Sequence, residues 1–231
     1  MGQKVKTAVF PVAGRGTRFL PATKASPKEM LPIVDKPLIQ YAVEEAIAAG
    51  ATKLVFVTGA SKRAIEDHFD VSYELEHQIA GTGKEKALDG IRTLIKDCTF
   101  SYTRQVNMAG LGDAILKGQT IIGDEPFAVV LAVDLCLGDV QGVLAQMVGL
   151  FRQYRFSIVA IEEVPATKRK QILHWDDKRS AVMESLRLGD STLSAVARKR
   201  LVIDKLEDRG QRIIAHGGDA AFLLGRPVGR G

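Results

Sequence analysis

Residues 7–32 read TAVFPVAGRGTRFLPATKASPKEMLP, and this stretch decides the fold. It begins with an apolar run of the kind found in buried parallel strands, and Gly14 and Gly16 follow at once. The two glycines let the backbone turn sharply and approach a ligand without interference from a Cβ atom. Backbone N–H groups in such a loop can point at an anion, and Arg18 and Lys28 bring positive charge to the same place. We therefore predict a loop that holds the phosphates of a nucleoside triphosphate.

The glycine spacing alone does not identify the loop. Gly14 and Gly16 lack the third glycine of the dinucleotide-binding fingerprint. No Gly-Lys-Ser/Thr follows them either, so the Walker A loop is also a poor match. Taken only as glycines, the two residues would be equally consistent with an ordinary turn.

Strand-like apolar segments alternate with helical patterns over residues 7–161. This alternation predicts an α/β fold with a Rossmann-like, doubly wound and mainly parallel sheet, whose ligands bind at the carboxyl ends of the strands. We expect Asp35 and Ser61 to cap the helices that follow them. The expected strands are residues 7–12, 53–58, 99–105, 127–131 and 157–161, and the expected helices are residues 37–49, 61–69, 73–79, 85–96, 112–122 and 140–154.

Composition divides the chain into two parts. With 231 residues, of which 46% are hydrophobic, the chain can bury a full core. The net charge of +5 is uneven, because residues 1–165 carry 18 Lys/Arg against 19 Asp/Glu and residues 166–231 carry 14 against 8. We therefore divide the chain into a core of residues 1–165 and a basic tail of residues 166–231, in which no strand alternation is visible.

The sequence also predicts the compartment. No run of about 18 apolar residues is present, so we expect no membrane span. No apolar signal-peptide region precedes the first strand, and a cytoplasmic location is the default expectation. Cys98 and Cys136 are then expected to be small, reduced core residues and not a disulfide.

The longer string is far more specific than its glycines. Residues 13–32, followed by VDKPLIQY at residues 34–41, closely resemble the N-terminal signature of bacterial UTP:glucose-1-phosphate uridylyltransferases. The resemblance covers residues 4–165. It implies a Mg²⁺-dependent nucleotidyltransferase that forms UDP-glucose and pyrophosphate from UTP and glucose-1-phosphate. It also implies that subunits of the protein can join as a homo-oligomer.

The resemblance implies roles for residues of the glycine loop. Ala13 and Gly14 would contact the uracil, and Gly16 and Thr17 would complete the nucleotide-binding loop. Arg18 and Lys28 would be the catalytic residues that bind and polarise the phosphates.

A second block, RQVNMAGLGDAI at residues 104–115, resembles the segment of the family that recognises uracil. Gln105 would hydrogen-bond the edge of the base, and Gly110 would present its backbone to the uracil. The family usually has histidine where this chain has Asp113. A carboxylate that pointed inward there would repel a triphosphate, so we expect Asp113 to face solvent as a helix N-cap.

A third block, LAVDL at residues 131–135, departs from the family. The family carries an Asp that holds Mg²⁺ at the position of Val133. An isopropyl group offers no oxygen ligand, so Asp134 is the remaining candidate metal ligand. Successive side chains of a strand point to opposite faces, and Asp134 can therefore serve only if the backbone bends at the end of the strand.

The family pattern stops near Pro165, and with it the motifs that would hold the sugar and its phosphate. One hypothesis is that residues 166–231 are a divergent or frame-disrupted tail; an intact reading frame in independent isolates would contradict the frame-shift version. A UTP-binding but catalytically impaired remnant is the first functional alternative. A thymidylyl- or other sugar-nucleotide transferase is another. A tail that contacts nucleic acid or an acidic partner is a third, although its mixed charges favour a solvated segment.

Overall fold

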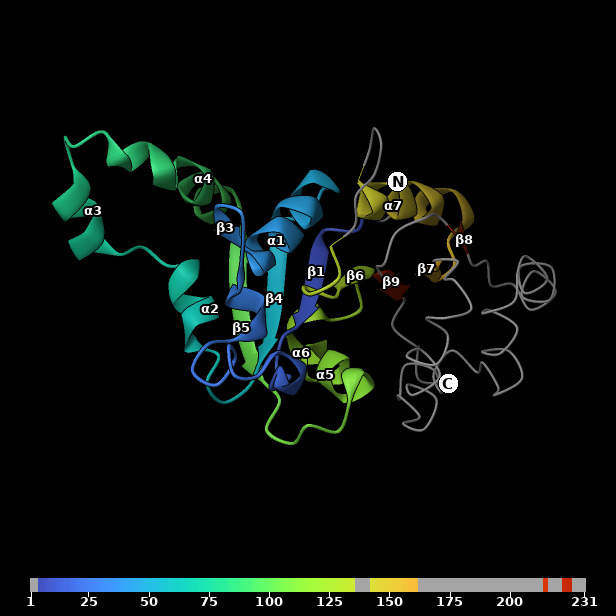
Figure 1. Cartoon of the computed structure of the whole chain (residues 1–231). Coiled ribbons are helices and arrows are strands. Elements are labelled where there is room, and N and C mark those ends of the chain that lie inside the picture. The colour runs from blue at the N-terminus through green and yellow to red at the C-terminus, as the bar shows by residue number, and fades with distance from the viewer. Residues whose placement is uncertain (1–3, 136–141, 162–213, 216–221, 226–231) are drawn as a thin grey trace.

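The computed structural model describes residues 4–135, 142–161, 214–215 and 222–225 (Figure 1). Its centre is a seven-stranded sheet in the order β5-β4-β1-β6-β9-β7-β8. A short antiparallel hairpin of β2 and β3 lies outside this sheet. The strands are β1 Thr7–Pro11, β2 Pro32–Ile33, β3 Lys36–Pro37, β4 Lys53–Thr58, β5 Thr99–Arg104, β6 Phe127–Val130, β7 Ile158–Ile161, β8 Ile214–Ala215 and β9 Phe222–Gly225.

Four parallel strands form the half of the sheet that carries the glycine loop. Strand β1 pairs with β4 on one side and with β6 on the other, and β4 pairs in turn with β5. Strand β1 is buried on both faces, with Ala8, Val9 and Phe10 fully inaccessible to solvent. A strand buried on both faces needs apolar side chains at consecutive positions, which explains the continuous apolar run of its sequence.

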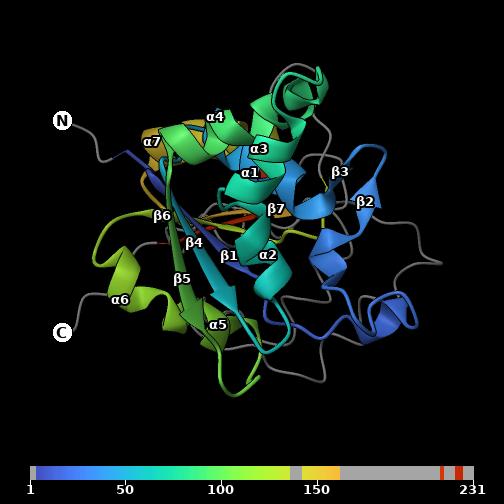
Figure 2. The same cartoon turned by 90° about the vertical axis from the view of Figure 1, so that its left-hand side faces the viewer.

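Helices cover both faces of the sheet (Figure 2). Residues of α1 and α7 form the larger core cluster on one face, against Phe10, Leu54 and Phe56 of the strands. Residues of α5 and α6 pack on the opposite face against Val9, Val55 and Val57. The helices are α1 Leu38–Ala48, α2 Arg63–His68, α3 Tyr73–Ile79, α4 Asp89–Asp97, α5 Leu111–Lys117, α6 Gln119–Ile122 and α7 Val143–Tyr154, with 3₁₀ turns η1 Thr17–Phe19, η2 Lys28–Met30 and η3 Lys84–Leu88.

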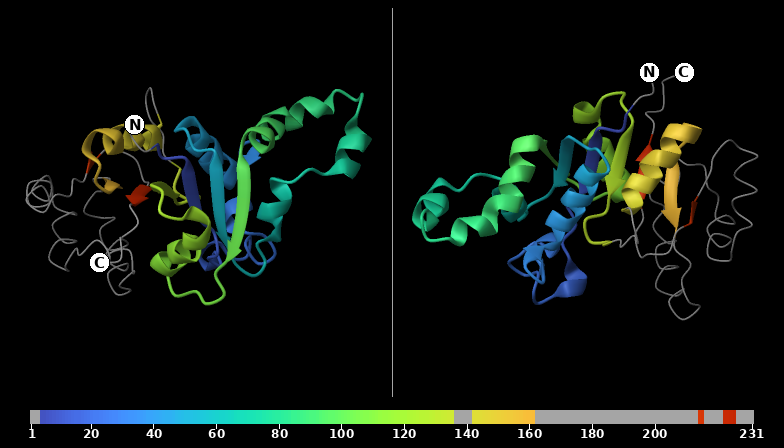
Figure 3. Two further views of the ribbon diagram at one scale, coloured as in Figure 1. Left: turned by 180° about the vertical axis from the view of Figure 1, so that it is seen from behind. Right: turned by 90° about the horizontal axis from the view of Figure 1, so that it is seen from above.

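The excursion between α2 and β5 forms an arm. In both views of Figure 3, α3 lies at the far end of this arm, away from the sheet. Helix α3 has no buried residue, whereas Ile91 and Leu94 of α4 pack against the core. The arm is therefore attached to the sheet through α4.

The predicted α/β class with a doubly wound, mainly parallel sheet is confirmed. Each of the five predicted strands is present, and β4 spans the predicted residues 53–58. The predicted helix at 112–122 is two helices, α5 and α6, which meet at Gly118. None of the described helices has the length and apolar character that a membrane crossing needs.

The two predicted helix caps are wrong. Helix α1 begins after Pro37 with no side-chain cap, and Asp35 lies in the β2–β3 turn, where its carboxylate accepts a hydrogen bond from the Tyr41 hydroxyl at 3.4 Å. Helix α2 begins after Lys62, and Ser61 has a left-handed φ of 64°.

The predicted boundary near residue 165 falls among residues outside those described. Within the predicted tail, only β8 and β9 are described, and β9 lies antiparallel between β6 and β7. The hypothesis of a divergent or frame-disrupted tail therefore stays a prediction. Cys98 is a free thiol, and Cys136 lies outside the described residues.

Candidate active site

The carboxyl ends of β1, β4, β5 and β6 bring the predicted site segments to one edge of the sheet. The N–H of Val12 donates to the carbonyl of Val57 at 3.0 Å, which carries the β1–β4 pairing beyond Pro11. A Cβ atom on Gly59 would lie 3.0 Å from the carbonyl oxygen of Ala13. Gly59 thus permits the loops after β1 and β4 to touch through their backbones, a requirement that the sequence did not reveal.

The glycine loop closes on itself around Gly16. This residue has a φ of 68°, and a Cβ atom on it would lie 3.0 Å from Cβ of Lys28. The Thr23 hydroxyl donates to the Gly16 carbonyl at 2.7 Å. Both the left-handed backbone and the close contact require glycine at this position.

Lys28 is the predicted phosphate ligand that the structure brings to the loop. A Cβ atom on Gly14 would lie 3.9 Å from the Lys28 ammonium nitrogen, so the charge lies beside the exposed Gly14 backbone. Thr17 and Arg18 are both exposed on η1, and Arg18 forms no ion pair with any described residue. The site as it stands therefore has one cation fixed against the glycine backbone and one that extends into solvent.

A buried ion pair supports this arrangement. The Lys62 ammonium nitrogen lies 2.7 Å from Oε2 of Glu29, and the two side chains are only 4% and 1% exposed. Oε1 of Glu29 is buried without a hydrogen bond, and the Lys28 ammonium lies 3.9 Å from it. Burial lowers the pKa of Lys62, while the hydrogen bond and negative charge of Glu29 act in the opposite direction.

This pair was not predicted from the sequence. Charged residues are almost never fully buried unless they are paired, so each of these two side chains needs the other in order to be buried here. It fixes η2, which carries Lys28, to the start of α2, the helix that follows the β4 loop.

Gln105 lies directly after β5, beside the loop of β4. Its N–H donates to the Thr58 carbonyl at 2.9 Å, and the residue is buried. The side-chain nitrogen donates to the Gly110 carbonyl at 3.0 Å. Gly110 has a φ of 105°, which explains glycine at this position.

The expectation that Asp113 is a helix N-cap is wrong, although its side chain is partly exposed to solvent. The residue before α5 is Gly110, and no side chain caps this helix. Oδ2 of Asp113 instead accepts a hydrogen bond from the Gln105 side-chain nitrogen at 2.7 Å. Its other carboxylate oxygen lies 3.5 Å from the Lys117 ammonium. The hydrogen bond from Gln105, with the charge of Lys117 as a smaller contribution, lowers the pKa of Asp113.

The backbone bend required of the metal-binding candidate is present. Strand β6 ends at Val130, and the N–H of Asp134 donates to the Leu131 carbonyl at 3.0 Å in a turn. The alternation of side chains along a strand therefore does not fix the direction of the Asp134 side chain. Among the described residues, however, no three His, Cys, Asp or Glu side chains gather in a set that could hold a metal ion. Within the described part of the chain, Asp134 is thus a candidate for a single carboxylate ligand.

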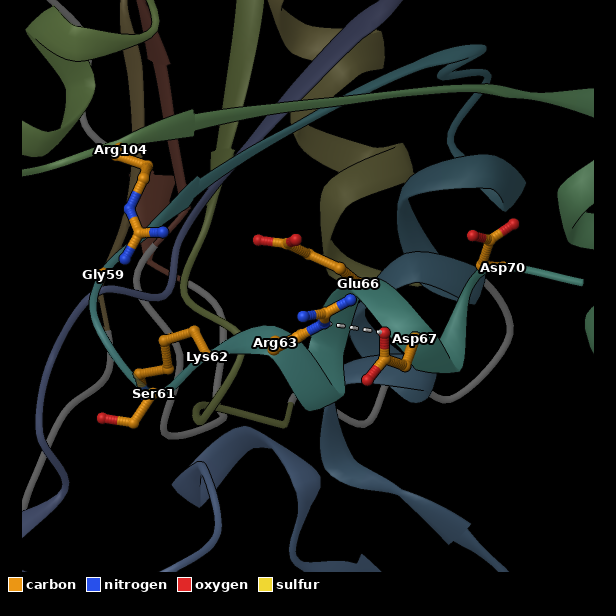
Figure 4. Close-up of a pocket in the computed structure, with 8 residues that line it drawn as sticks. All are labelled: Gly59, Ser61, Lys62, Arg63, Glu66, Asp67, Asp70 and Arg104. Atoms are coloured by element: carbon orange, nitrogen blue, oxygen red, sulfur yellow. Dashed lines mark ion pairs between the residues drawn. The ribbon is translucent and has the colours of Figure 1, made fainter. Parts of the chain in front are cut away.

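A cavity of about 340 Å³ opens beside this edge (Figure 4). Gly59 and Lys62 form part of its wall, Arg104 lies at the end of β5, and Arg63 pairs with Asp67 at 3.8 Å. None of the predicted nucleotide-binding residues lines it. It shares Gly59 with the β1–β4 loop contact and Lys62 with the buried ion pair, so the cavity adjoins the predicted site without containing it.

The similarity to known proteins lies in the part of the chain that carries the site. Residues 8–171 match the family model described as nucleotidyl transferase. A UTP–glucose-1-phosphate uridylyltransferase of Pseudomonas aeruginosa PAO1 is 68% identical over 162 residues, which are 70% of this chain and 58% of that enzyme.

Two solved structures are similar to the same part of this chain. The crystal structure of a UDP-glucose pyrophosphorylase complexed with UDP-glucose is similar with a TM-score of 0.64 and 57% identity, over 71% of this chain and 60% of that one. A UTP-bound UGPase from Acinetobacter baumannii is similar with a TM-score of 0.67 and 39% identity, over 70% of this chain and 57% of that one. This chain thus spans about three fifths of the length of these relatives.

The Lys62→Met variant tests the buried ion pair. It leaves the Glu29 carboxylate buried without its partner, and breaking a buried pair in this way costs about 3–5 kcal/mol of unfolding free energy. The double variant Glu29→Leu/Lys62→Met removes both charges and is expected to recover most of that loss. Urea unfolding monitored by circular dichroism measures the stability of both variants.

Lys53→Met, which breaks the exposed pair with Glu125, is the matched control and should leave stability nearly unchanged. Equal stability of Lys62→Met and the wild type would contradict the supporting role of the pair.

Proposed function

The chain belongs to the nucleotidyl transferase family, and on this premise we propose that it is a UTP:glucose-1-phosphate uridylyltransferase. The product would be UDP-glucose, with pyrophosphate released. The relatives that support this proposal are named for that activity or for UDP-glucose, and their identity to this chain reaches 68%. Because the chain spans 58% of the Pseudomonas enzyme, activity, substrates and assembly all belong to the proposal.

One arrangement supports the nucleotide part of the proposal most directly. Lys28 lies beside the glycine loop after β1, while Gln105 and Gly110 follow β5 at the same edge of the sheet. A cation beside free backbone N–H groups suits phosphate, and a buried carboxamide suits the polar edge of a base. A nucleoside triphosphate offers both groups in one molecule.

The proposed reaction is an in-line displacement at the α-phosphorus of UTP. A phosphate oxygen of glucose-1-phosphate forms the new P–O bond, and the bond between the α-phosphorus and its bridge to the β-phosphate breaks. Negative charge then accumulates on the departing pyrophosphate. Lys28 and Arg18 are the described cations that could stabilise this charge, Lys28 from its fixed position and Arg18 by moving in from solvent.

Mg²⁺ remains part of the proposal in a limited form. Magnesium ions at nucleotide sites are commonly held by one or two carboxylates together with the phosphates of the substrate. Asp134, at the turn after β6, is the candidate for such a single carboxylate. When bound, the ion would neutralise phosphate charge.

A second candidate function is UTP binding without turnover. Val133, where the resemblance implies a metal-binding Asp, favours it. The thymidylyl alternative differs in the base and sugar accepted. A cytoplasmic location and a homo-oligomeric assembly follow from the resemblance alone and stay predictions.

The deciding experiment measures pyrophosphate release by the purified chain with UTP, glucose-1-phosphate and Mg²⁺, together with UTP binding by calorimetry. We expect UTP binding and pyrophosphate release that requires both substrates. UTP binding without release would favour the second candidate. In that case Val133→Asp, which restores an oxygen ligand, is expected to lower the Mg²⁺ concentration needed for half-maximal UTP binding, whereas Val133→Leu should not. Absence of UTP binding by a folded chain would contradict both candidates.

Lys28→Met tests the phosphate contact. A hydrogen bond to a charged group contributes about 1.5–3 kcal/mol, so UTP affinity should fall by about 10- to 100-fold, while uridine affinity changes little. Lys24→Met is the control, because Lys24 is an exposed lysine of the same loop. If the two variants bound UTP equally well, Lys28 would have no phosphate contact.

A further inference from the structure

We propose that Asp113 is a positioning residue that fixes the Gln105 side chain with its oxygen toward the ligand, and that the site thereby selects a base with a ring N–H donor. The inference rests on the proposed function, in which Gln105 meets the base. It goes further by giving the chemical basis of base choice and by assigning a role to Asp113.

The orientation of the Gln105 carboxamide follows from its two neighbours. The Asp113 carboxylate and the Gly110 carbonyl can only accept hydrogen bonds, and they lie 2.7 Å and 3.0 Å from the same side-chain atom of Gln105. That atom must be the NH₂ nitrogen, because an oxygen there would face two acceptors. Both amide hydrogens are then used within the protein.

Asp113 is held in the ionised, accepting form by its surroundings. The Gln105 hydrogen bond and the Lys117 ammonium, 3.5 Å from the other carboxylate oxygen, lower its pKa. An ionised carboxylate cannot reverse its role, whereas histidine at this position could donate or accept according to its tautomer. The orientation of the Gln105 amide is therefore better defined with Asp113 than it would be with a residue that can both donate and accept.

The only hydrogen-bonding atom of the Gln105 side chain left for a ligand is Oε1. Among the described residues, no hydrogen bond reaches this oxygen. The residue itself is buried, and its backbone N–H is held by Thr58, so it has little freedom to adapt. The site thus presents a fixed acceptor.

A fixed acceptor discriminates between pyrimidines. Uracil carries an N–H at ring position 3 and would donate to Oε1. Cytosine has a lone pair at that position, and two acceptors in contact repel each other. A buried polar group left without its partner discriminates more strongly than a missing apolar contact. The wild-type chain should therefore bind UTP at least tenfold more tightly than CTP.

The test is calorimetric titration of the full chain and of its Asp113→Asn variant with UTP and with CTP. An asparagine can donate as well as accept, so only the Gly110 carbonyl then opposes the turned amide, in which Oε1 of Gln105 accepts from the asparagine and its NH₂ faces cytosine. We expect the ratio of UTP to CTP affinity to fall by about fivefold or more, with CTP binding tightened. Lys117→Met is the matched control, because it removes the ion pair and leaves the Gln105 contact; its ratio should match the wild type.

Each other outcome has a definite meaning. Equal weakening of both nucleotides in Asp113→Asn, or an unchanged ratio, would contradict the positioning role while leaving the proposed function standing. Absence of UTP binding by the wild type would contradict both. If Asp113→Asn did not fold, solvent exchange of the Gln105 side-chain amide hydrogens in the wild type, measured by NMR, would decide: exchange as fast as that of an exposed glutamine would overturn the proposal.

Discussion

Glu29 and Lys62 form an ion pair whose side chains are only 1% and 4% exposed, and this pair joins two segments far apart in the sequence. Desolvation makes each charge costly to bury alone, so neither segment can take its position without the other. Glu29 lies on η2 next to Lys28, and Lys62 precedes α2 after the β4 loop. The position of Lys28 beside Gly14 and Gly16 therefore depends on the Glu29–Lys62 pair. The left-handed backbone of Gly16 and the close approach of Gly59 to Ala13 hold the same loops together.

Much of this fold could be predicted from the sequence because its strands are buried on both faces. Apolar runs such as that of β4 leave little choice of secondary structure, and parallel strands must place their carboxyl ends at one edge. The caps assigned to Asp35 and Ser61 failed for a shared reason. Each was inferred from the local sequence. Asp35 instead lies in the β2–β3 turn, and Ser61 has a left-handed φ and precedes the N-cap residue of α2.

Asp113 is a case within the site in which the local sequence could not predict the contact that the residue makes. Its position at the start of a helical pattern suggested an N-cap, a role defined by neighbours in sequence. Its actual partner, Gln105, is eight residues away and becomes a neighbour only when α5 folds back beside the end of β5. Gly59 and the Glu29–Lys62 pair escaped prediction for the same reason, since each acts through a contact between separate loops. The position of β9 between β6 and β7 is likewise a matter of long-range pairing that no local pattern reveals.

The order of the strands separates two parts of the proposed site. Gln105 directly follows β5 and Val133 follows β6, with β4 and β1 between these two strands. Neighbouring strands lie about 4.8 Å apart, so three such intervals separate the two strand ends by roughly 14 Å. Effects at sites more than about 7–10 Å apart that share no partner generally add independently. Under the proposed function, substitutions at Gln105 and at Val133 are therefore expected to have independent effects.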